Sequence, residues 1–448
     1  MSDELVVSFL FPPSNFVSAI TVLKRIIENN NPADVLSVKN NDDFLEFNEI
    51  IDVYIDDRIV LDLECFEDNP DCIFRFTDKG LKSIKKDYSK IYSRSWFMAN
   101  HFLAFEYKLS DESVFWRAEF SDPLLLTMKN NYKSSPSMNI TDEVFIDRLN
   151  SKITELNSEN NSDYDLVENP SSAYFICEYI VYLFADEIVF TNENQRKIML
   201  DRFPIDVKSR VLAKSQIKPH PTLPDNFYHI RDIHLDLNDD YINIAYFGNE
   251  FYGLRHFEGL FYAINTLNHK FLSRVKFYFF INDSELFNLL TRDFDNITVK
   301  KPLEYLDFLN ATTKFDILLV NDAETSRYFE INPYLPSKIS DYLGSGRDIW
   351  SICEKNSSLS RIDVKYKSFA NDYSSIRDTL IRILDDNDLA DEDYSINEDY
   401  LADRFTELNE ILEKENLRKN KYKKLKKDDD SSKKSLLKSL GRFKRRHG

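Results

Sequence analysis

The feature that most constrains the fold is a repeated pattern of short apolar runs, each followed by a segment with helical periodicity. Leu5–Phe11 is a nearly continuous apolar run of strand length, and apolar side chains recur with helical spacing over residues 17–27. The same alternation returns in the second half of the chain, beginning at Tyr241–Phe247. Such runs are typical of parallel strands that are buried on both faces. The pattern therefore predicts an α/β fold with Rossmann-like, doubly wound parallel sheets.

A proline-rich stretch separates the two series. Residues 218–224 read KPHPTLP, and three prolines in seven positions indicate a connection between domains. A chain of 448 residues also exceeds what one compact core usually supports. The predicted divisions are an N-terminal Rossmann-like domain at 1–217, a linker at 218–236, a second Rossmann-like domain at 237–394, a C-terminal helix at 395–427 and a basic amphipathic tail at 428–448.

Periodicity places further elements in both halves of the chain. In the first half, strands are predicted at 34–38, 58–63, 114–120 and 187–190, and helices at 78–93, 141–157, 171–184 and from 191 to about 203. In the second half, strands are predicted at 241–247, 275–281, 297–300, 317–320 and 349–352, and helices at 255–266, 284–290, 303–311, 374–386 and 397–417.

The charge is unevenly distributed. The net charge is −18, yet residues 414–448 carry 15 Lys and Arg against 4 Asp and Glu. An acidic body argues against binding of nucleic acid, whereas the basic tail is expected to meet an anionic surface. The tail combines an apolar stripe with a basic face: Leu436, Leu440 and Phe443, with Lys438, Arg442, Lys444, Arg445 and Arg446. This pattern favours contact with an anionic membrane surface, and a solvated tail is the alternative.

The cysteines and the apolar segments indicate the expected compartment. Cys65, Cys72, Cys177 and Cys353 lack the spacing of metal ligands, and all four are expected to be reduced thiols of a cytoplasmic protein. The N-terminus is acidic and runs directly into a strand, so no signal peptide is expected. The longest apolar region, 173–185, contains a glutamate and is too short to span a bilayer.

The stretch LPSKISDYLGSGRDIW at 335–350 is the strongest candidate for ligand recognition. It predicts a short helix that ends in a left-handed turn at Gly344 or Gly346. The Asp341 carboxylate on this helix would accept hydrogen bonds from a ribose diol, and Lys338 lies one turn before it. An ordinary helix with a structural Lys–Asp pair is the alternative.

A second glycine-bearing strand end reads YFGNEFYGLR at 246–255. Gly248 ends the predicted strand, and Arg255 stands near the start of the next helix. Backbone N–H groups at a helix N-terminus together with a guanidinium form a cradle for a diphosphate. A surface role for Arg255 is the alternative. The sequence has no Walker A pattern, GxGxxG fingerprint or metal-ligand cluster, which argues against an NTPase, a dehydrogenase and a metalloenzyme.

Ser14 and Asn15 follow the first strand after two prolines. Both side chains suit the N-terminal capping of the next helix. They also stand where a ligand at the strand's C-terminal end would be contacted.

These motifs together resemble the retaining glycosyltransferases of family 4, which have the two-Rossmann glycosyltransferase B fold. The resemblance covers about residues 4–390 in the family's order, and it rests on these stretches: FPPSN at 11–15, WRAEFSDPL at 116–124, ADEIVFTNENQR at 185–196, KPHPTLP at 218–224, YFGNEFYGLR at 246–255 and LPSKISDYLGSG at 335–346. The tail after residue 428 lies outside it.

The resemblance implies that the two domains bind different substrates. The second domain would bind a nucleotide-sugar as substrate, with Asp341 at the ribose and Arg255 at the diphosphate, and no cofactor or metal would be needed. The implied donor-binding residues are Gly248, Asn249, Arg255, Lys338, Asp341, Leu343, Gly344 and Pro302. The first domain would bind a glycan or lipid-linked acceptor beside Ser14 and Asn15, with Asp122 near the transferred sugar.

One position departs from the family pattern of two glutamates separated by seven residues. Eight residues before Asp341 stands Pro333, and Glu330 is the nearest carboxylate. Glu330 or the backbone amides near Tyr334 would then hold the sugar hydroxyls. The expected activity is sugar transfer in bacterial cell-surface polysaccharide synthesis, on the inner face of the membrane. A catalytically silent subunit that binds a partner enzyme or glycan, or a sugar-nucleotide epimerase of the same fold, is the alternative.

Overall fold

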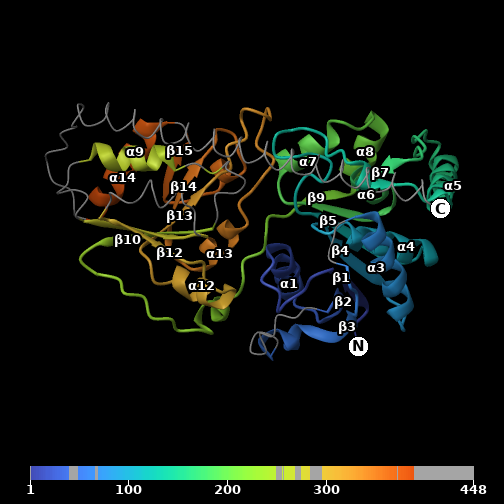
Figure 1. Cartoon of the computed structure of the whole chain (residues 1–448), viewed down its shortest axis with the longest axis horizontal. Helices are drawn as coiled ribbons and strands as arrows, with labels where there is room; N and C mark the ends of the chain where they lie inside the picture. Colours follow the sequence, from blue (N-terminus) through green and yellow to red (C-terminus); the bar gives the residue numbers. More distant parts are fainter. Residues whose placement is uncertain are drawn as a thin grey trace, which may run out of the picture.

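The computed structural model describes residues 2–39, 49–65, 69–248, 255, 257–267, 274–282, 295–370 and 372–387. Two parallel sheets with helices on both faces form the molecule (Figure 1). The expected α/β architecture with two Rossmann-like domains is confirmed. The expected helix at 395–427, the tail at 428–448 and the expected helix at 284–290 lie outside the described residues.

The first sheet has seven parallel strands in the order β3-β2-β1-β4-β5-β8-β9. Its strands are β1 (Glu4–Val7), β2 (Ala33–Val38), β3 (Ile55–Leu61), β4 (Lys90–Arg94), β5 (Phe115–Phe120), β8 (Glu187–Phe190) and β9 (Ser215–Ile217). Its helices are α1 (Val17–Asn29), α3 (Pro70–Ser83), α4 (Ala99–Ser110), α5 (Glu143–Asn160), α6 (Ala173–Phe184), α7 (Glu193–Leu200) and α8 (Ile205–Lys214). A two-residue antiparallel pair joins β6 (Asn139–Ile140) to β7 (Ser171–Ser172).

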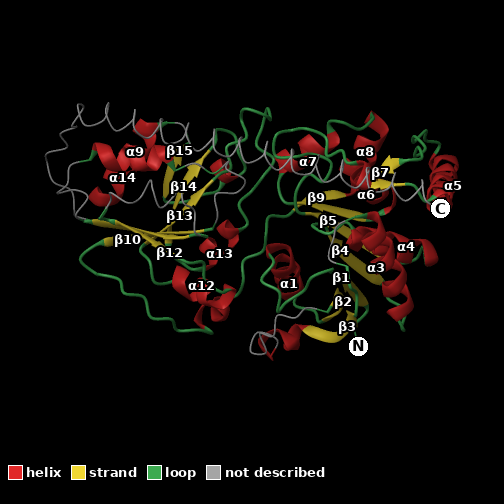
Figure 2. Ribbon diagram, viewed as in Figure 1, coloured by secondary structure: helices red, strands yellow, loops and turns green. Residues whose placement is uncertain are grey.

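The second sheet has six parallel strands in the order β12-β11-β10-β13-β14-β15. Figure 2 draws the strands of both sheets in yellow and the helices in red. Its strands are β10 (Ile242–Phe247), β11 (Val275–Phe280), β12 (Ile297–Lys300), β13 (Ile317–Asn321), β14 (Asp348–Cys353) and β15 (Tyr366–Phe369). Its helices are α9 (Glu258–Thr266), α12 (Tyr305–Thr312), α13 (Lys338–Gly344) and α14 (Tyr373–Asp385). Strand order reverses between β10 and β13, and the carboxyl ends of strands at such a point form a crevice for ligands.

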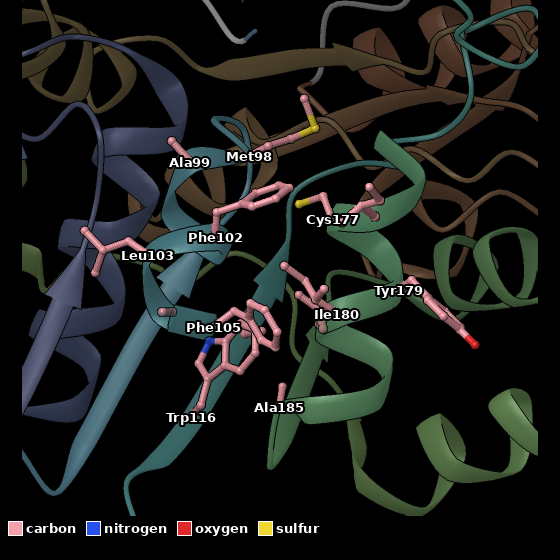
Figure 3. Packing of buried hydrophobic residues seen from close by; sticks show 14 of the residues in the cluster. Met98, Ala99, Phe102, Leu103, Phe105, Trp116, Cys177, Tyr179, Ile180 and Ala185 are labelled. Atoms are coloured by element: carbon pink, nitrogen blue, oxygen red, sulfur yellow. The ribbon is translucent and has the colours of Figure 1, made fainter. Parts of the chain in front are cut away.

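The cores explain why the apolar runs form these strands. In the first domain, apolar side chains of α4, β5 and α6 pack together, including Phe102, Trp116 and Ile180 (Figure 3). In the second domain, α9 and α14 cover one face of the sheet, and α12 and α13 cover the other. Each sheet is buried on both faces, as the continuous apolar runs predict.

The two domains meet along an apolar surface that includes α1. Ile20 and Leu23 of α1 belong to the same buried cluster as Phe227 and Tyr228 of the 3₁₀ helix η3 (Asp225–His229) and Leu309 of α12. Figure 1 shows α1 on the side of the first sheet that faces α12 and α13. The segment predicted as a linker therefore contributes buried side chains to the contact between domains.

Two sequence-based expectations are wrong. The helix predicted at 78–93 ends at Ser83 as α3, and β4 begins at Lys90. The five-residue β4 has a lysine and an arginine at its ends, so it lacks the continuous apolar run that marked the other strands. The four cysteines are not all reduced, because Cys65 and Cys72 form a disulfide, while Cys177 and Cys353 are buried thiols outside any disulfide.

The short helix predicted within residues 335–350 is present as α13. Ser337 is its N-cap position, and the left-handed turn expected after it occurs at Gly346, where φ is +70°. Within the described residues, no helix combines the length and the apolar character needed to cross a bilayer.

Candidate functional site

Gly248 marks the carboxyl end of β10, at the point where strand order reverses. Its φ of +140° is a conformation that favours glycine, and its N–H donates to the carbonyl of Phe280 at 3.0 Å. A Cβ built there would lie 2.3 Å from the Nζ of Lys338. Glycine thus allows the backbone at this strand end to approach a lysine side chain closely.

Lys338 is the first residue of α13, and its ammonium group lies beside this strand end. Its Nζ is buried 3.8 Å from the centroid of the Tyr246 ring, a cation–π contact. The Nζ finds no hydrogen-bond acceptor among the residues that the structure describes. Burial holds the pKa of Lys338 well below its ordinary value, and the charge of Arg255 lowers it further. A nearby anion would reverse that shift.

Arg255 lies close enough to act on three other ionisable groups. Its charge lowers the pKa values of Lys338, Asp322 and Asp122. Arg255 and Lys338, two of the predicted donor-binding residues, are therefore together at the end of β10. A guanidinium and an amine that lie together at a strand end are suited to a diphosphate.

Asp322 follows β13 directly, and the charge of Arg255 acts on its carboxyl as well. Its Oδ2 accepts a hydrogen bond from the backbone N–H of Glu354 at 2.9 Å, while its buried Oδ1 has no partner in the described part of the chain. Burial raises the pKa of Asp322 to about 7, and the neighbouring Glu354 contributes to this rise. The Glu354 carboxylate itself accepts hydrogen bonds from Thr325, Ser326 and Asn332.

Asp122 reaches the crevice from the first domain, two residues after β5. Burial raises the pKa of its carboxyl, and the charges of Arg94, Lys133 and Arg255 oppose that rise. Arg94 and Lys133 belong to the first domain and Arg255 to the second. The electrostatic contact with Arg255 places Asp122 where the two domains face each other.

Asp341 lies on α13 and is buried at the domain contact, with 6% exposure. Its Oδ1 accepts hydrogen bonds from the Nζ of Lys24 at 2.6 Å and from the hydroxyl of Tyr305 at 2.8 Å. The same Lys24 Nζ donates to the Oγ of Ser340 at 3.0 Å. The predicted ribose-binding carboxylate is therefore paired with a lysine of the other domain.

The remaining predicted positions have varied environments. Glu330 is exposed, and its nearest cation is Lys197 of α7, at 3.9 Å, so the structure does not bring it into the buried cluster. Pro302 is exposed between β12 and α12, and Leu343 is 47% exposed. A Cβ at Gly344 would meet the Tyr228 hydroxyl at 2.1 Å. Glycine is thus required there for packing.

The predicted acceptor residues lie in the loop between β1 and α1. Ser14 is buried, with its N–H donating to the carbonyl of Phe11 at 3.2 Å. The Asn15 side chain donates to Glu304 of the second domain. Neither side chain caps α1 by a hydrogen bond, since the N-cap position is Phe16. The predicted donor residue Asn249 lies outside the described residues.

Three residues of the site carry no prediction from sequence. Asp322 directly follows the apolar run of β13, so a search for carboxylates just after buried strands would have found it. Lys24 and Tyr305 carry no such signal, because each acquires its role from the contact between domains. Sequence spacing alone does not reveal which helices of two domains will face each other.

The chain was compared with known proteins by sequence and by structure. No protein-family model and no curated protein sequence matches it. Among solved structures, sucrose-phosphate synthase from Thermosynechococcus elongatus is similar, with 12% identity, a TM-score of 0.54, and coverage of 87% of this chain and 91% of that one.

Two further structural matches have lower scores. A glycosyltransferase from Rickettsia africae has 11% identity and a TM-score of 0.49, with 91% of this chain and 98% of that chain covered. A UDP-N-acetylglucosamine 2-epimerase has 12% identity and a TM-score of 0.48, with 87% and 89% covered. Of these three structures, sucrose-phosphate synthase alone has a TM-score above 0.5, and its likeness shows that this chain has the two-Rossmann glycosyltransferase B fold.

Proposed function

We propose that this protein is a retaining glycosyltransferase that transfers a sugar from a nucleotide-sugar donor to a glycan or lipid-linked acceptor. The observation that carries the proposal is the grouping of Gly248, Arg255 and Lys338 at the point where strand order reverses. In an open α/β sheet, ligands bind outside the carboxyl ends of the strands at this point. The fold supports the same assignment.

The chemistry would use these residues to stabilise the leaving nucleoside diphosphate. As the bond from the sugar to the diphosphate breaks, negative charge develops on the phosphate oxygens. Binding of the anionic donor would raise the pKa of Lys338, so that the amine takes up a proton from solvent before the reaction. Arg255 and the protonated Lys338 would then stabilise the developing charge from fixed positions, which is the usual source of large rate effects. A metal ion would not be needed for this purpose. Asp122, across the crevice, would lie near the transferred sugar.

The ribose would lie at Asp341, and the base near Pro302 at the start of the loop before α12. Pro333 stands where the family pattern has an acid, and Asp322 is a buried carboxyl on which the charge of Arg255 acts. It would take part in holding the donor. The acceptor would bind on the side of the first domain, beside the loop that carries Ser14 and Asn15.

A thermal-shift screen tests the proposal directly. A nucleoside diphosphate that binds the folded state raises the melting temperature by mass action. We expect UDP, GDP or ADP, or a corresponding nucleotide-sugar, to raise it, and the Arg255→Ala variant to lose the shift while keeping its own melting temperature. No shift with any nucleotide in the wild-type protein would refute donor binding. Donor binding without hydrolysis or transfer would instead identify a catalytically silent subunit.

The place of action proposed from sequence is the inner face of a bacterial cell membrane, in surface-polysaccharide assembly. It rests on the basic, amphipathic pattern of residues 428–448, which lie outside the described residues. Removal of residues 431–448 should abolish co-sedimentation with vesicles that contain anionic lipid. Unchanged co-sedimentation would contradict the attachment.

A further inference from the structure

A buried ion pair joins the two domains at the residue expected to bind ribose. Lys24 lies on α1 of the first domain and is 3% exposed, and Asp341 lies on α13 of the second. Their atoms Nζ and Oδ1 are 2.6 Å apart. Since the partners belong to different domains, this contact exists only when the domains are together.

The two oxygens of the Asp341 carboxylate have different environments. Oδ1 accepts from both Lys24 and Tyr305. The hydrogen bonds and the ion pair that the Asp341 side chain makes with described side chains all end at Oδ1, and the side chain retains 8% exposure. The Tyr305 hydroxyl approaches from α12, directly after the loop in which the base is proposed to bind. One oxygen is thus fixed by protein donors, and the other is left to accept.

We infer that Lys24 and Tyr305 position the Asp341 carboxylate so that Oδ2 accepts a hydrogen bond from the ribose hydroxyls of the donor. This inference rests on the proposed function. Lys24 is a positioning residue, because it acts on the ligand through Asp341. The arrangement couples donor binding to domain contact, since the carboxylate is fully oriented only when α1 lies against α13.

The energetics favour a positioning role over a stabilising one. A buried ion pair gives little net stability, because desolvation of both charges offsets their attraction. The apolar cluster that contains Ile20, Leu23 and Leu309 already holds the domains together. What Lys24 adds is orientation: its Nζ is itself fixed by the Ser340 hydroxyl, so the carboxylate is held from two directions.

The test is a ratio of affinities measured by isothermal titration calorimetry. UDP, GDP and ADP are each compared with their 2′-deoxy forms, which lack one hydroxyl of the ribose diol. The wild-type protein should bind one ribonucleotide roughly 10-fold or more tightly than its 2′-deoxy form, as expected when a charged acceptor loses its hydrogen bond. In Lys24→Met this ratio should fall to about 3-fold or less, because a misoriented carboxylate no longer distinguishes the two ligands.

The ratio of the ribonucleotide affinity to the 2′-deoxynucleotide affinity distinguishes a positioning role of Lys24 from a purely structural one. A purely structural loss in Lys24→Met would weaken both ligands equally and leave the ratio unchanged. Tyr305→Phe, which removes only a hydroxyl, should lower the ratio as well, and it serves if Lys24→Met does not fold. The matched control is Lys86→Met, which removes a lysine 2.6 Å from the buried Asp34 inside the first domain. It should keep the wild-type ratio.

The outcomes for the inference and for the proposed function are distinct. If the wild-type protein discriminates between the two sugars and both variants retain that ratio, the positioning inference is overturned and the proposed function stands. If the wild-type protein binds none of the three diphosphates, the proposed function fails, and the inference fails with it.

Discussion

Two buried charged clusters lie near strand ends in this molecule, and their hydrogen bonding is opposite. In the first domain, Glu119 accepts from Arg25 at 2.8 Å, from Arg94 at 3.0 Å and from the Tyr92 hydroxyl at 3.0 Å. In the second domain, the Nζ of Lys338 and the Oδ1 of Asp322 are buried without a partner in the described ranges. One cluster is complete within the protein, and the other is not.

The pKa values reflect this difference. Burial raises the pKa of Glu119, but the Arg25 and Arg94 guanidiniums more than offset that effect and bring it to about 2. For Asp322, hydrogen bonds and the charge of Arg255 offset the effect of burial only in part, and the pKa is raised to about 7. A satisfied buried network fixes one structure, whereas an unsatisfied buried group costs about 1–3 kcal/mol that a ligand can recover. The first cluster is thus a structural support, and the second has the character of a binding site.

The largest expected effect comes from breaking the complete cluster. Glu119→Ala leaves the charges of Arg25 and Arg94 buried without their common partner, which should lower the free energy of unfolding by about 3–5 kcal/mol. Urea denaturation followed by circular dichroism measures the loss. Glu155→Ala, which removes a surface partner of Lys152, is the control and should cost less than about 1 kcal/mol. Equal losses in the two variants would remove the distinction between a support and an ordinary ion pair.

The next effect should appear in ligand binding instead of stability. Lys338→Met replaces a buried amine that lacks an acceptor with an apolar side chain of similar length, so the free energy of unfolding should be unchanged or higher. The affinity for a nucleoside diphosphate should fall about 100-fold, because a charge-assisted hydrogen bond is lost. Lys355→Met, at an exposed lysine near the Phe369 ring, should change neither quantity. A strongly destabilised Lys338→Met protein with normal affinity would reverse the interpretation.

The cluster around Glu119 and the cluster around Lys338 and Asp322 were not equally predictable from sequence. The strands β1, β10 and β13 and the helix α13 follow from local patterns, because buried parallel strands require continuous apolar runs. Gly248 and Arg255 were found through the same strand-end logic. The pattern of residues 335–350 singled out Asp341, and the resemblance to a family pointed to the same residue. The spacing of residues did not show that Lys24 would pair with its carboxylate.

What remained hidden depends on packing between distant segments. β4 has only three residues between its Lys90 and Arg94 ends, too few for a clear pattern, although it brings Arg94 to Glu119. The ion pair of Lys24 with Asp341 joins positions 317 residues apart. Which helix of one domain meets which helix of the other is set by the apolar surfaces of both. Such a contact has no local sequence signature.

The pH dependence of stability should separate the two clusters further. Asp322 has a folded-state pKa near 7 against an ordinary value of 3.8, so the folded state binds its proton more tightly. The tighter proton binding adds to the free energy of unfolding. This addition is fully present below about pH 4 and is lost as pH rises through 7. Asp322→Asn cannot ionise, so relative to wild type it should gain roughly 1–2 kcal/mol of stability between pH 5 and 7.

The measurement is the free energy of unfolding of both proteins from urea titrations at pH 5, 6, 7 and 8. Above pH 7 the difference between Asp322→Asn and wild type should become constant. Glu119, with its pKa near 2, is ionised throughout this range and should contribute no slope. A pH-independent difference between the two proteins would show that Asp322 is not held protonated by its surroundings.

The smallest effect is expected at Glu330, which belongs to neither cluster. Its carboxylate is 81% exposed and lies 3.9 Å from Lys197, a geometry in which water screens most of the interaction. Glu330→Gln should therefore change the free energy of unfolding by less than about 0.5 kcal/mol, and donor affinity by less than about 2-fold if the sugar is held within the buried crevice. Calorimetry with the nucleotide-sugar identified by the thermal-shift screen measures the second quantity. A loss of about 10-fold or more would instead show that this exposed acid replaces the carboxylate missing at Pro333, and that the loop carrying it moves inward when the donor binds.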